Sequence, residues 1–301
     1  MVFLALAVAC SLSIAVLFKL AERRDFDRTA LLTVNYAAAA ALAVVLQGVA
    51  PAEGVTAGLV GLGVVQGVLF IGGFWLFSLA IREAGMGLAA GVMRLSVVVP
   101  FVASWLVWGE TPGTLQLVGL ALAGVAFFLV AQPASEPPGK LGPPASGDAA
   151  GVGPEAGEAG RTVGLLALLF LSGGLVDVNM KAFQETFAEA VPISTFLLFV
   201  FGVAFLVGAA AVVVGGVRTG RWPRGAVLGW GVVLGLVNYG SAEFLLRALV
   251  EVPGPIAFPA NSVAIVFGAA LIGRVVWSER LSRANVAGLV AAGVALLLLA
   301  G

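Results

Sequence analysis

Histidine is absent from this chain, cysteine occurs once, and charged side chains are scarce. Without histidine the chain lacks the side chain that most often transfers protons near neutral pH and most often binds metals. The single cysteine, Cys10, cannot form a disulfide within the chain. No glycine-rich phosphate-binding loop is found. We therefore exclude a nucleotide-driven pump within this one chain, and we expect no cofactor and no metal site.

Only 11% of the 301 residues are charged, whereas 60% are hydrophobic and the mean hydropathy is +1.09. A soluble domain with this balance would lack the polar side chains that cover a water-facing surface. The 16 basic and 16 acidic residues cancel, so the net charge favours no acidic partner such as nucleic acid. We predict an all-α integral membrane protein that is solvated by the lipid bilayer, with many passes through a cell membrane, the bacterial inner membrane being expected.

Ten apolar runs follow one another along the chain, five before and five after a central segment. Each run is about 20 residues long, enough at 1.5 Å per residue to cross the ~30 Å hydrocarbon layer as a helix. The central residues 133–161 are rich in Gly, Ala and Pro, and we expect them to form a flexible linker. The predicted spans are 2–20, 29–46, 56–81, 86–107, 115–131, 163–180, 193–214, 226–249, 256–276 and 284–299.

The two groups of five runs are related by sequence repetition. Residues 108–131 match residues 277–300 at 10 of 24 positions, and further matches with an offset of 168 align the third run with the eighth. Because five is an odd number of spans, the second copy would enter the membrane from the opposite side. We therefore predict two inverted five-helix repeats, 1–132 and 162–301. Small residues at repeated positions are expected to let helix backbones approach closely; they are Gly119, Gly124, Gly288 and Gly293.

Short motifs recur at matching places in the two halves. They are Ser96-Val-Val-Val-Pro100 and Trp108-Gly-Glu110 in the first half, and Pro259-Ala-Asn261-Ser and Trp277-Ser-Glu279-Arg-Leu in the second. In these motifs the chain resembles the drug/metabolite transporter superfamily, specifically the ten-helix EamA-type transporters. The resemblance covers essentially the whole chain apart from the linker. It implies a carrier that works by alternating access around a central cavity, but it implies no particular substrate or binding residue, because the matching motifs are structural.

The basic residues are distributed unevenly between the loops. Loops after odd-numbered runs hold 13 of the 16 Lys and Arg, loops after even-numbered runs hold two, and Arg94 lies inside a run. The positive-inside rule then places the odd-numbered loops in the cytoplasm and both termini outside. The family resemblance implies the opposite orientation, with termini inside. We predict termini outside, because the charge bias is so large.

Ionisable side chains inside apolar spans cost ~2.5–3.5 kcal/mol each on insertion scales. Asp177 and Lys181 are four residues apart in the sixth run, and Glu243 and Arg247 are four apart in the eighth, which places each pair on one helix face. Either pair can simply neutralise itself near the interface, or it can line a cavity and bind a charged substrate. Asp177 and, as the stronger candidate, Glu243 are the expected sites of proton coupling.

Arg94 lies about two turns, or ~12 Å, inside the fourth run, without an acidic partner in that run. We expect it to contact an anionic group of the substrate or an acid on another helix, such as Glu243. Buried amides either join helices by hydrogen bonds or bind a ligand. The candidate substrate-binding residues are Gln66, Arg94, Asn179, Asn238, Tyr239, Glu243, Arg247 and Asn261.

Two further features are expected to be architectural. Glu110 and Glu279 stand just before the fifth and tenth runs, where each can cap or tie the following helix. Pro100 and Pro259 interrupt backbone hydrogen bonding at corresponding places in the two halves. Such interruptions suit bent helices, either beside a cavity or without a functional role.

These features favour a secondary active transporter of small polar or amphipathic metabolites, driven by protons or by exchange. A membrane-embedded lipid-modifying enzyme is an alternative, but the chain lacks histidine, a clustered acidic motif and a Ser/Lys arrangement suited to nucleophilic catalysis. A non-transporting membrane scaffold is a second alternative, although it would not need buried charges or an inverted repeat. We thus expect no enzymatic activity, a small-molecule substrate and the lipid bilayer as partners, and a monomer or homodimer.

Overall fold

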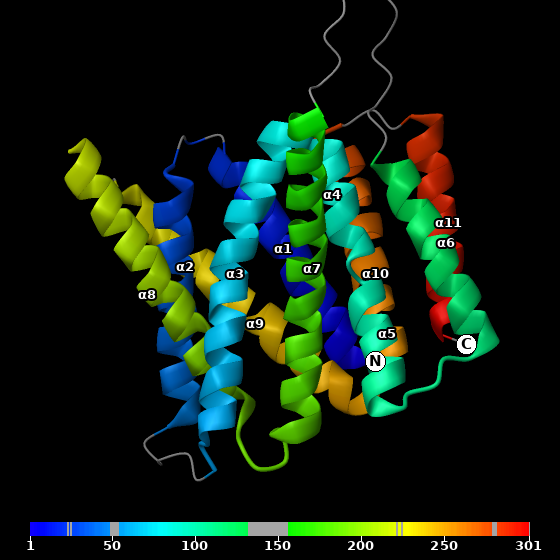
Figure 1. Cartoon of the computed structure of the whole chain (residues 1–301), viewed down its shortest axis with the longest axis horizontal. Coiled ribbons are helices and arrows are strands. Elements are labelled where there is room, and N and C mark those ends of the chain that lie inside the picture. The colour runs from blue at the N-terminus through cyan, green and yellow to red at the C-terminus, as the bar shows by residue number, and fades with distance from the viewer. Residues whose placement is uncertain are drawn as a thin grey trace, which may run out of the picture.

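The computed structural model describes residues 1–22, 24, 26–48, 54–131, 156–220, 222–223, 225–278 and 282–300. Within these residues all regular secondary structure is helical (Figure 1). The helices are α1 (Val2–Glu22), α2 (Arg28–Gln47), α3 (Ala57–Ala84), α4 (Met86–Leu95), α5 (Val98–Trp108), α6 (Thr114–Val130), α7 (Ala156–Thr186), α8 (Ile193–Thr219), α9 (Ala226–Glu251), α10 (Gly254–Val276) and α11 (Arg283–Ala300).

Most of these helices are built for a lipid environment. Eight segments are long and apolar enough to cross a membrane, namely α1, α2, α3, α4 together with α5, α7, α8, α9 and α10, whereas α6 and α11 are apolar but shorter. Large apolar side chains such as Leu106 and Leu297 point outward, with 72% and 76% of their surface exposed. Many exposed apolar side chains of this kind are suited to a lipid environment. The chain is therefore an all-α, multi-pass membrane protein.

Only the last six residues of the predicted linker, 156–161, lie within the described structure. Residues 133–155 lie outside the described residues, and residues 156–161 are helical as the beginning of α7. The linker prediction was therefore too long at this end. Alanine, glutamate and arginine in residues 156–161 favour a helix, and here they extend the apolar run that follows.

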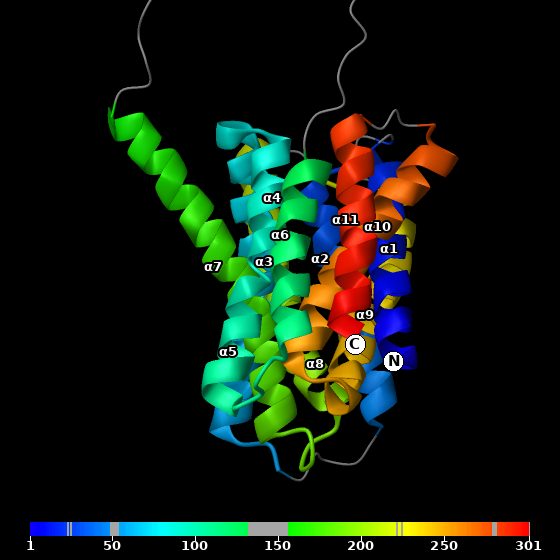
Figure 2. The ribbon, with the colours of Figure 1, turned by 90° about the vertical axis from the view of Figure 1, so that its right-hand side faces the viewer.

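The helices stand side by side in one bundle (Figures 1 and 2). In the bundle α1 and α2 pack on α9, while α7 and α8 pack on α3. The helices α2 and α8 pack on each other, as do α6 and α11, and α10 contacts α1, α5 and α11. Both chain ends lie in the lower half of Figure 1, whereas the chain leaves α6 and enters α7 at the upper end.

A break divides the fourth predicted span into α4 and α5. Pro100, in the first turn of α5, has no N–H to donate to the carbonyl of Ser96. Ser96 turns its hydroxyl back to the Met93 carbonyl at 2.6 Å, and the Val99 N–H bonds to the Ser96 carbonyl over three residues instead of four. The bend predicted at Pro100 is thus confirmed, whereas α10 continues as one helix through Pro259.

Glycines set the closest helix contacts. A side chain at Gly235 on α9 would place its Cβ 2.3 Å from the Asn35 carbonyl oxygen on α2. Of the repeat glycines, Gly119 and Gly288 do lie at the close contact of α6 with α11, as predicted. Gly293 has no atom within 4 Å of such a Cβ, so its predicted packing role is wrong.

Candidate functional site

Helix α7 carries three of the buried polar side chains of the bundle, Ser172, Asn179 and Lys181. It packs against α3, α4, α5 and α9. Two glycines let it lie directly on the α4–α5 break: a Cβ at Gly173 would come within 2.7 Å of the Ser96 hydroxyl, and one at Gly174 within 2.4 Å of the Val99 Cβ. This contact fixes the position of Asp177, Asn179 and Lys181, which follow on the same helix.

Lys181 is almost completely buried, with 1% of its surface exposed. Its ammonium group lies 2.8 Å from Glu110 Oε1 and 2.5 Å from Glu185 Oε1, and it also donates to Gln184 Oε1 at 3.2 Å. Breaking a buried ion pair leaves an uncompensated charge, so these contacts offset the cost of burying the lysine inside the bundle. The predicted pairing of Lys181 with Asp177 is wrong. Glu185 is also four residues from Lys181 and is the acid that pairs with it on α7. Glu110, just after α5, is the second acidic partner.

Glu110 connects three parts of the bundle. One carboxylate oxygen accepts from Lys181, and the other accepts from the backbone N–H of Gly254 at 2.8 Å, at the start of α10. A carboxylate at a helix N-terminus satisfies a free N–H and interacts favourably with the helix dipole. Glu110 was expected to tie the helix that follows it, α6. It caps α10 in the other half instead, because the chain turns at Gly109, which adopts φ +71°.

Arg94 on α4 and Asp177 on α7 belong to different halves of the chain, on two helices that pack against each other. Neither side chain makes a hydrogen bond or a direct ion pair within the described part of the chain. That Arg94 faces an acid on another helix stays a prediction, although Asp177 lies on a helix that packs against its own. Glu243 has other partners.

Gln66 and Asn179 join α3 to α7. The Asn179 amide donates to Gln66 Oε1 and to the Leu62 carbonyl, both at 2.9 Å, and the Gln66 amide donates to the Val176 carbonyl at 3.2 Å. Gln66 is fully buried. Of the two roles considered for these amides, the geometry shows the interhelical hydrogen bond.

Glu243 lies in a polar cluster on α9. Arg247 donates to Glu243 Oε1 from Nε at 2.8 Å, and the Tyr239 hydroxyl donates to Glu243 Oε2 at 2.8 Å. Glu243 is buried, whereas 48% of the Arg247 side chain is exposed, and the guanidinium lies over the Phe3 ring of α1. The predicted pair on one helix face is therefore confirmed as a contact.

The remaining candidates do not join these groups. Asn238 makes no hydrogen bond within the described residues and is half-buried on α9. The Oδ1 atom of Asn261 on α10 is buried without a hydrogen-bond partner there. Asn35 on α2, a lesser candidate of the same kind, has the same property. Within the described residues no group of three or more Asp, Glu and Cys side chains could hold a metal ion.

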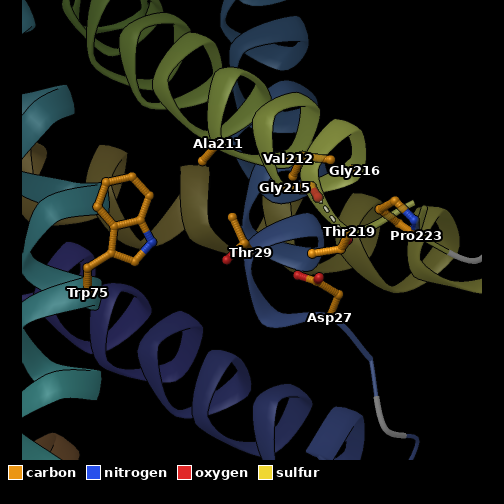
Figure 3. Close-up of a pocket in the computed structure, with 9 residues that line it drawn as sticks. All are labelled: Asp27, Thr29, Trp75, Ala211, Val212, Gly215, Gly216, Thr219 and Pro223. Carbon is orange, nitrogen blue, oxygen red and sulfur yellow. Dashed lines mark hydrogen bonds between the residues drawn. The ribbon is translucent and has the colours of Figure 1, made fainter. Parts of the chain in front are cut away.

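A recess of about 620 Å³ opens between α2, α3 and α8, away from the α7 cluster (Figure 3). Its polar groups serve local structure: Asp27 caps α2 by accepting from the Ala30 N–H at 2.9 Å, and the Thr219 hydroxyl donates to the Gly215 carbonyl at 2.8 Å. None of the predicted site residues lines it. The lining residues are Asp27, Thr29, Trp75, Ala211, Val212, Gly215, Gly216, Thr219 and Pro223.

Comparison with known proteins supports the fold without naming an activity. No protein-family model matches the chain. An uncharacterized protein from Haemophilus influenzae is 23% identical over 301 residues, an alignment that covers 94% of this chain and 92% of the relative. A protein solved by crystallography superposes with a TM-score of 0.69 at 16% identity, covering 99% of this chain and 96% of the other. The similarity to that structure extends over the whole bundle, so the fold occurs in another protein.

Proposed function

We propose that the protein is a secondary active transporter of small polar or amphipathic metabolites, as its resemblance to EamA-type transporters implies. The observation that carries this proposal is that charged groups inside the bundle connect the two halves of the chain. Glu110 of residues 1–132 pairs with Lys181 of residues 162–301 inside the bundle. Charges within a membrane are costly and tend to mark solute or proton pathways.

The location of these charges suits alternating access. In that mechanism one half of a carrier rocks against the other around a site near the middle of the membrane. Contacts between the halves must break on one side and form on the other. Ion pairs such as Lys181 with Glu110 are suited to this. The pair is strong while the two halves are in contact, and water can hydrate each partner once the halves separate.

The packing of the helices supports ten spans in two inverted halves as part of the proposal. Taking α4 and α5 as one span, the two halves supply five spans each. The contact of α1 and α2 with α9 then corresponds to the contact of α7 and α8 with α3, and the pairs α2–α8 and α6–α11 each join equivalent helices. Reciprocal helix contacts of this kind are expected of two copies related by an axis in the membrane plane.

Transport is tested with the full chain reconstituted in liposomes that contain a mixed metabolite extract. We expect at least one small polar solute to leave faster than from protein-free liposomes, and to leave faster still when the same solute is present outside. The exposed Arg82, in the last turn of α3, provides the control variant Arg82→Gln, which should behave as wild type. If no solute leaves faster with the protein present, the transporter proposal is wrong.

A further inference from the structure

The recess of about 620 Å³ lies where helices α3 and α8 separate. Below the recess the two helices touch closely, because a Cβ at Gly67 on α3 would meet the Val200 carbonyl oxygen on α8 at 2.5 Å. Further up, the recess stands between Trp75 on α3 and Ala211 on α8 (Figure 3). Figure 1 shows the upper part of α8 leaning away from α3. The recess is therefore the upper continuation of the α3–α8 interface, left open by the tilt of α8.

The lining of the recess changes from apolar to polar along its length. Ala211, Val212 and Gly215 lie within the apolar helix α8, whereas Thr219 is the last residue of that helix and Asp27 stands just before α2. The stretch from Ala211 to Thr219 covers about 12 Å along the helix, at 1.5 Å per residue. An apolar depth with a polar mouth at the end of a membrane span matches the two parts of a phospholipid, its acyl chain and its headgroup.

Basic residues stand beside the mouth of the recess on two helices. Arg28, the first residue of α2, lies between the lining residues Asp27 and Thr29, and Arg218 lies in the last turn of α8. Both arginines are exposed. Residues 190–242 contain arginine at positions 218, 221 and 224 and no acidic residue. Basic groups at the end of a membrane span attract anionic headgroups, and a guanidinium binds a phosphate with two parallel hydrogen bonds.

We propose that the recess binds a phospholipid with an anionic headgroup, such as phosphatidylglycerol. The acyl chain lies against Trp75 and α8, and Arg28 and Arg218 hold the phosphate. This inference goes beyond the transport proposal and does not depend on it, because it requires only that the chain spans a membrane. The recess lies between α2 and α3 of the first half and α8 of the second, so the bound lipid contacts both halves.

The charges at the mouth favour an anionic lipid over a zwitterionic one. Arg28, Arg218 and Asp27 together carry one positive charge in excess, which a lipid with one negative charge neutralises. Asp27 already has a structural role, since its Oδ1 accepts from the Ala30 N–H at 2.9 Å and caps α2. A zwitterionic phosphatidylethanolamine would instead pair its ammonium group with Asp27 and leave the positive charge in excess.

The test measures which lipid stays on the purified full chain. Delipidated protein in detergent is mixed with equal amounts of phosphatidylglycerol and phosphatidylethanolamine that carry the same acyl chains, and the complexes are counted by native mass spectrometry. We expect at least threefold more of the phosphatidylglycerol complex. Equal amounts, or more of the phosphatidylethanolamine complex, overturn the proposal. Glycerol 3-phosphate in large excess should not displace the lipid, and displacement would overturn the acyl-chain part of the site.

Two glycines of α8 offer a matched pair for locating the lipid. A Cβ at Gly215, which lines the recess, or at Gly202, which does not, would meet no atom within 4 Å. Gly215→Leu therefore fills the recess without pushing α8 away, and it should lower the phosphatidylglycerol complex at least threefold. Gly202→Leu should leave the complex unchanged. Unchanged binding in Gly215→Leu, or an equal loss in Gly202→Leu, overturns the site.

Charge variants test the headgroup contacts. Arg28→Gln and Arg218→Gln should each reduce the preference for phosphatidylglycerol, whereas Arg283→Gln, at the start of α11, should not, because α11 packs on α6 and α10. Asp27→Asn keeps a capping side chain and should retain the lipid. An unchanged preference in both arginine variants, or its loss in Asp27→Asn, overturns the proposal. If a variant does not fold, the lipid comparison on the wild-type chain still decides it, and because transport is not scored, failure here leaves the transporter proposal standing.

Discussion

Lys181 Nζ lies 2.8 Å from Glu110 Oε1, although the two residues stand 71 positions apart in different halves of the chain. The second oxygen of the same carboxylate accepts from the Gly254 N–H. One side chain therefore holds together the end of α5, the lower part of α7 and the start of α10. This contact joins the two halves at that end of the bundle.

Removing the Glu110 carboxylate should cost much more stability than removing an exposed acid. We expect Glu110→Ala to lower the free energy of unfolding by about 3 kcal/mol, the lower end for a broken buried ion pair, because Glu185 still contacts Lys181. The control is Glu83→Ala, whose partner Arg161 is 72% exposed. That variant should cost less than about 1 kcal/mol.

The comparison uses equilibrium unfolding of the purified protein in mixed micelles. A second variant that also replaces the lysine, Glu110→Ala with Lys181→Met, should recover part of the loss, because no unpaired ammonium remains buried. Equal losses for Glu110→Ala and Glu83→Ala would mean that the buried connection contributes no more than a surface contact.

Two glycines of α9 offer a matched test of helix packing. A Cβ at Gly235 would meet the Asn35 carbonyl oxygen at 2.3 Å, whereas one at Gly229 would meet no atom within 4 Å. We expect Gly235→Ala to destabilise the protein by about 1–3 kcal/mol or more, because α2 and α9 must separate. Gly229→Ala should be neutral or stabilising by up to about 1 kcal/mol. The same unfolding measurement checks both, and similar values would contradict the close α2–α9 contact.

The helices and their local pairs could be predicted from the sequence because they depend on neighbouring residues. Long apolar runs predict the spans, Pro100 predicts the break between α4 and α5, and the spacing of Glu243 and Arg247 predicts their contact. The short helices α6 and α11 illustrate the limit of this approach. Their apolar runs can be recognised in the sequence, but the helices are shorter than the other spans.

The partners of the charged residues on α7 could not be predicted in the same way. Asp177 and Glu185 are each four residues from Lys181 along the helix, and nothing in the sequence excludes either as its partner. The choice is made by helix packing, which brings Glu110 to Lys181. Glu110 comes from the other half of the chain, so its position depends on contacts between the halves such as Gly173 with Ser96.

Glu243 remains the residue that we predict to couple transport to protons. Its carboxylate is buried and held by Tyr239 and Arg247, and a change of either contact between two conformations would change how well its negative charge is compensated. We expect Glu243→Gln to transport without the pH dependence of the wild type. Rates in proteoliposomes at several pH values check this. A pH profile that is unchanged in Glu243→Gln would make the residue structural.

Replacing Arg247 shows how much its ion pair with Glu243 contributes to stability when one partner is half exposed. Arg247→Ala leaves Glu243 with the Tyr239 hydroxyl, and half of the lost arginine side chain was exposed. We therefore expect a loss of about 1–2 kcal/mol, smaller than for Glu110→Ala, because water can reach the site and weakens the ion pair. Unfolding in mixed micelles provides the comparison. A larger loss for Arg247→Ala than for Glu110→Ala would contradict this ranking.

The orientation in the membrane follows from which end of the bundle carries the basic residues. Loops after odd-numbered spans hold 13 of the 16 Lys and Arg, and the helices that precede these loops, α1, α3, α6, α8 and α10, end at the upper end of Figure 1, opposite to both chain ends. The positive-inside rule places this end in the cytoplasm.

Single cysteines introduced into a Cys10→Ser chain test this orientation, with Arg82→Cys at the upper end and Glu189→Cys after α7 at the lower end. A membrane-impermeant maleimide should label only Glu189→Cys in intact cells and both variants after permeabilisation. Labelling of Arg82→Cys alone in intact cells would place the termini inside, and the charge bias would then not decide the orientation of this chain.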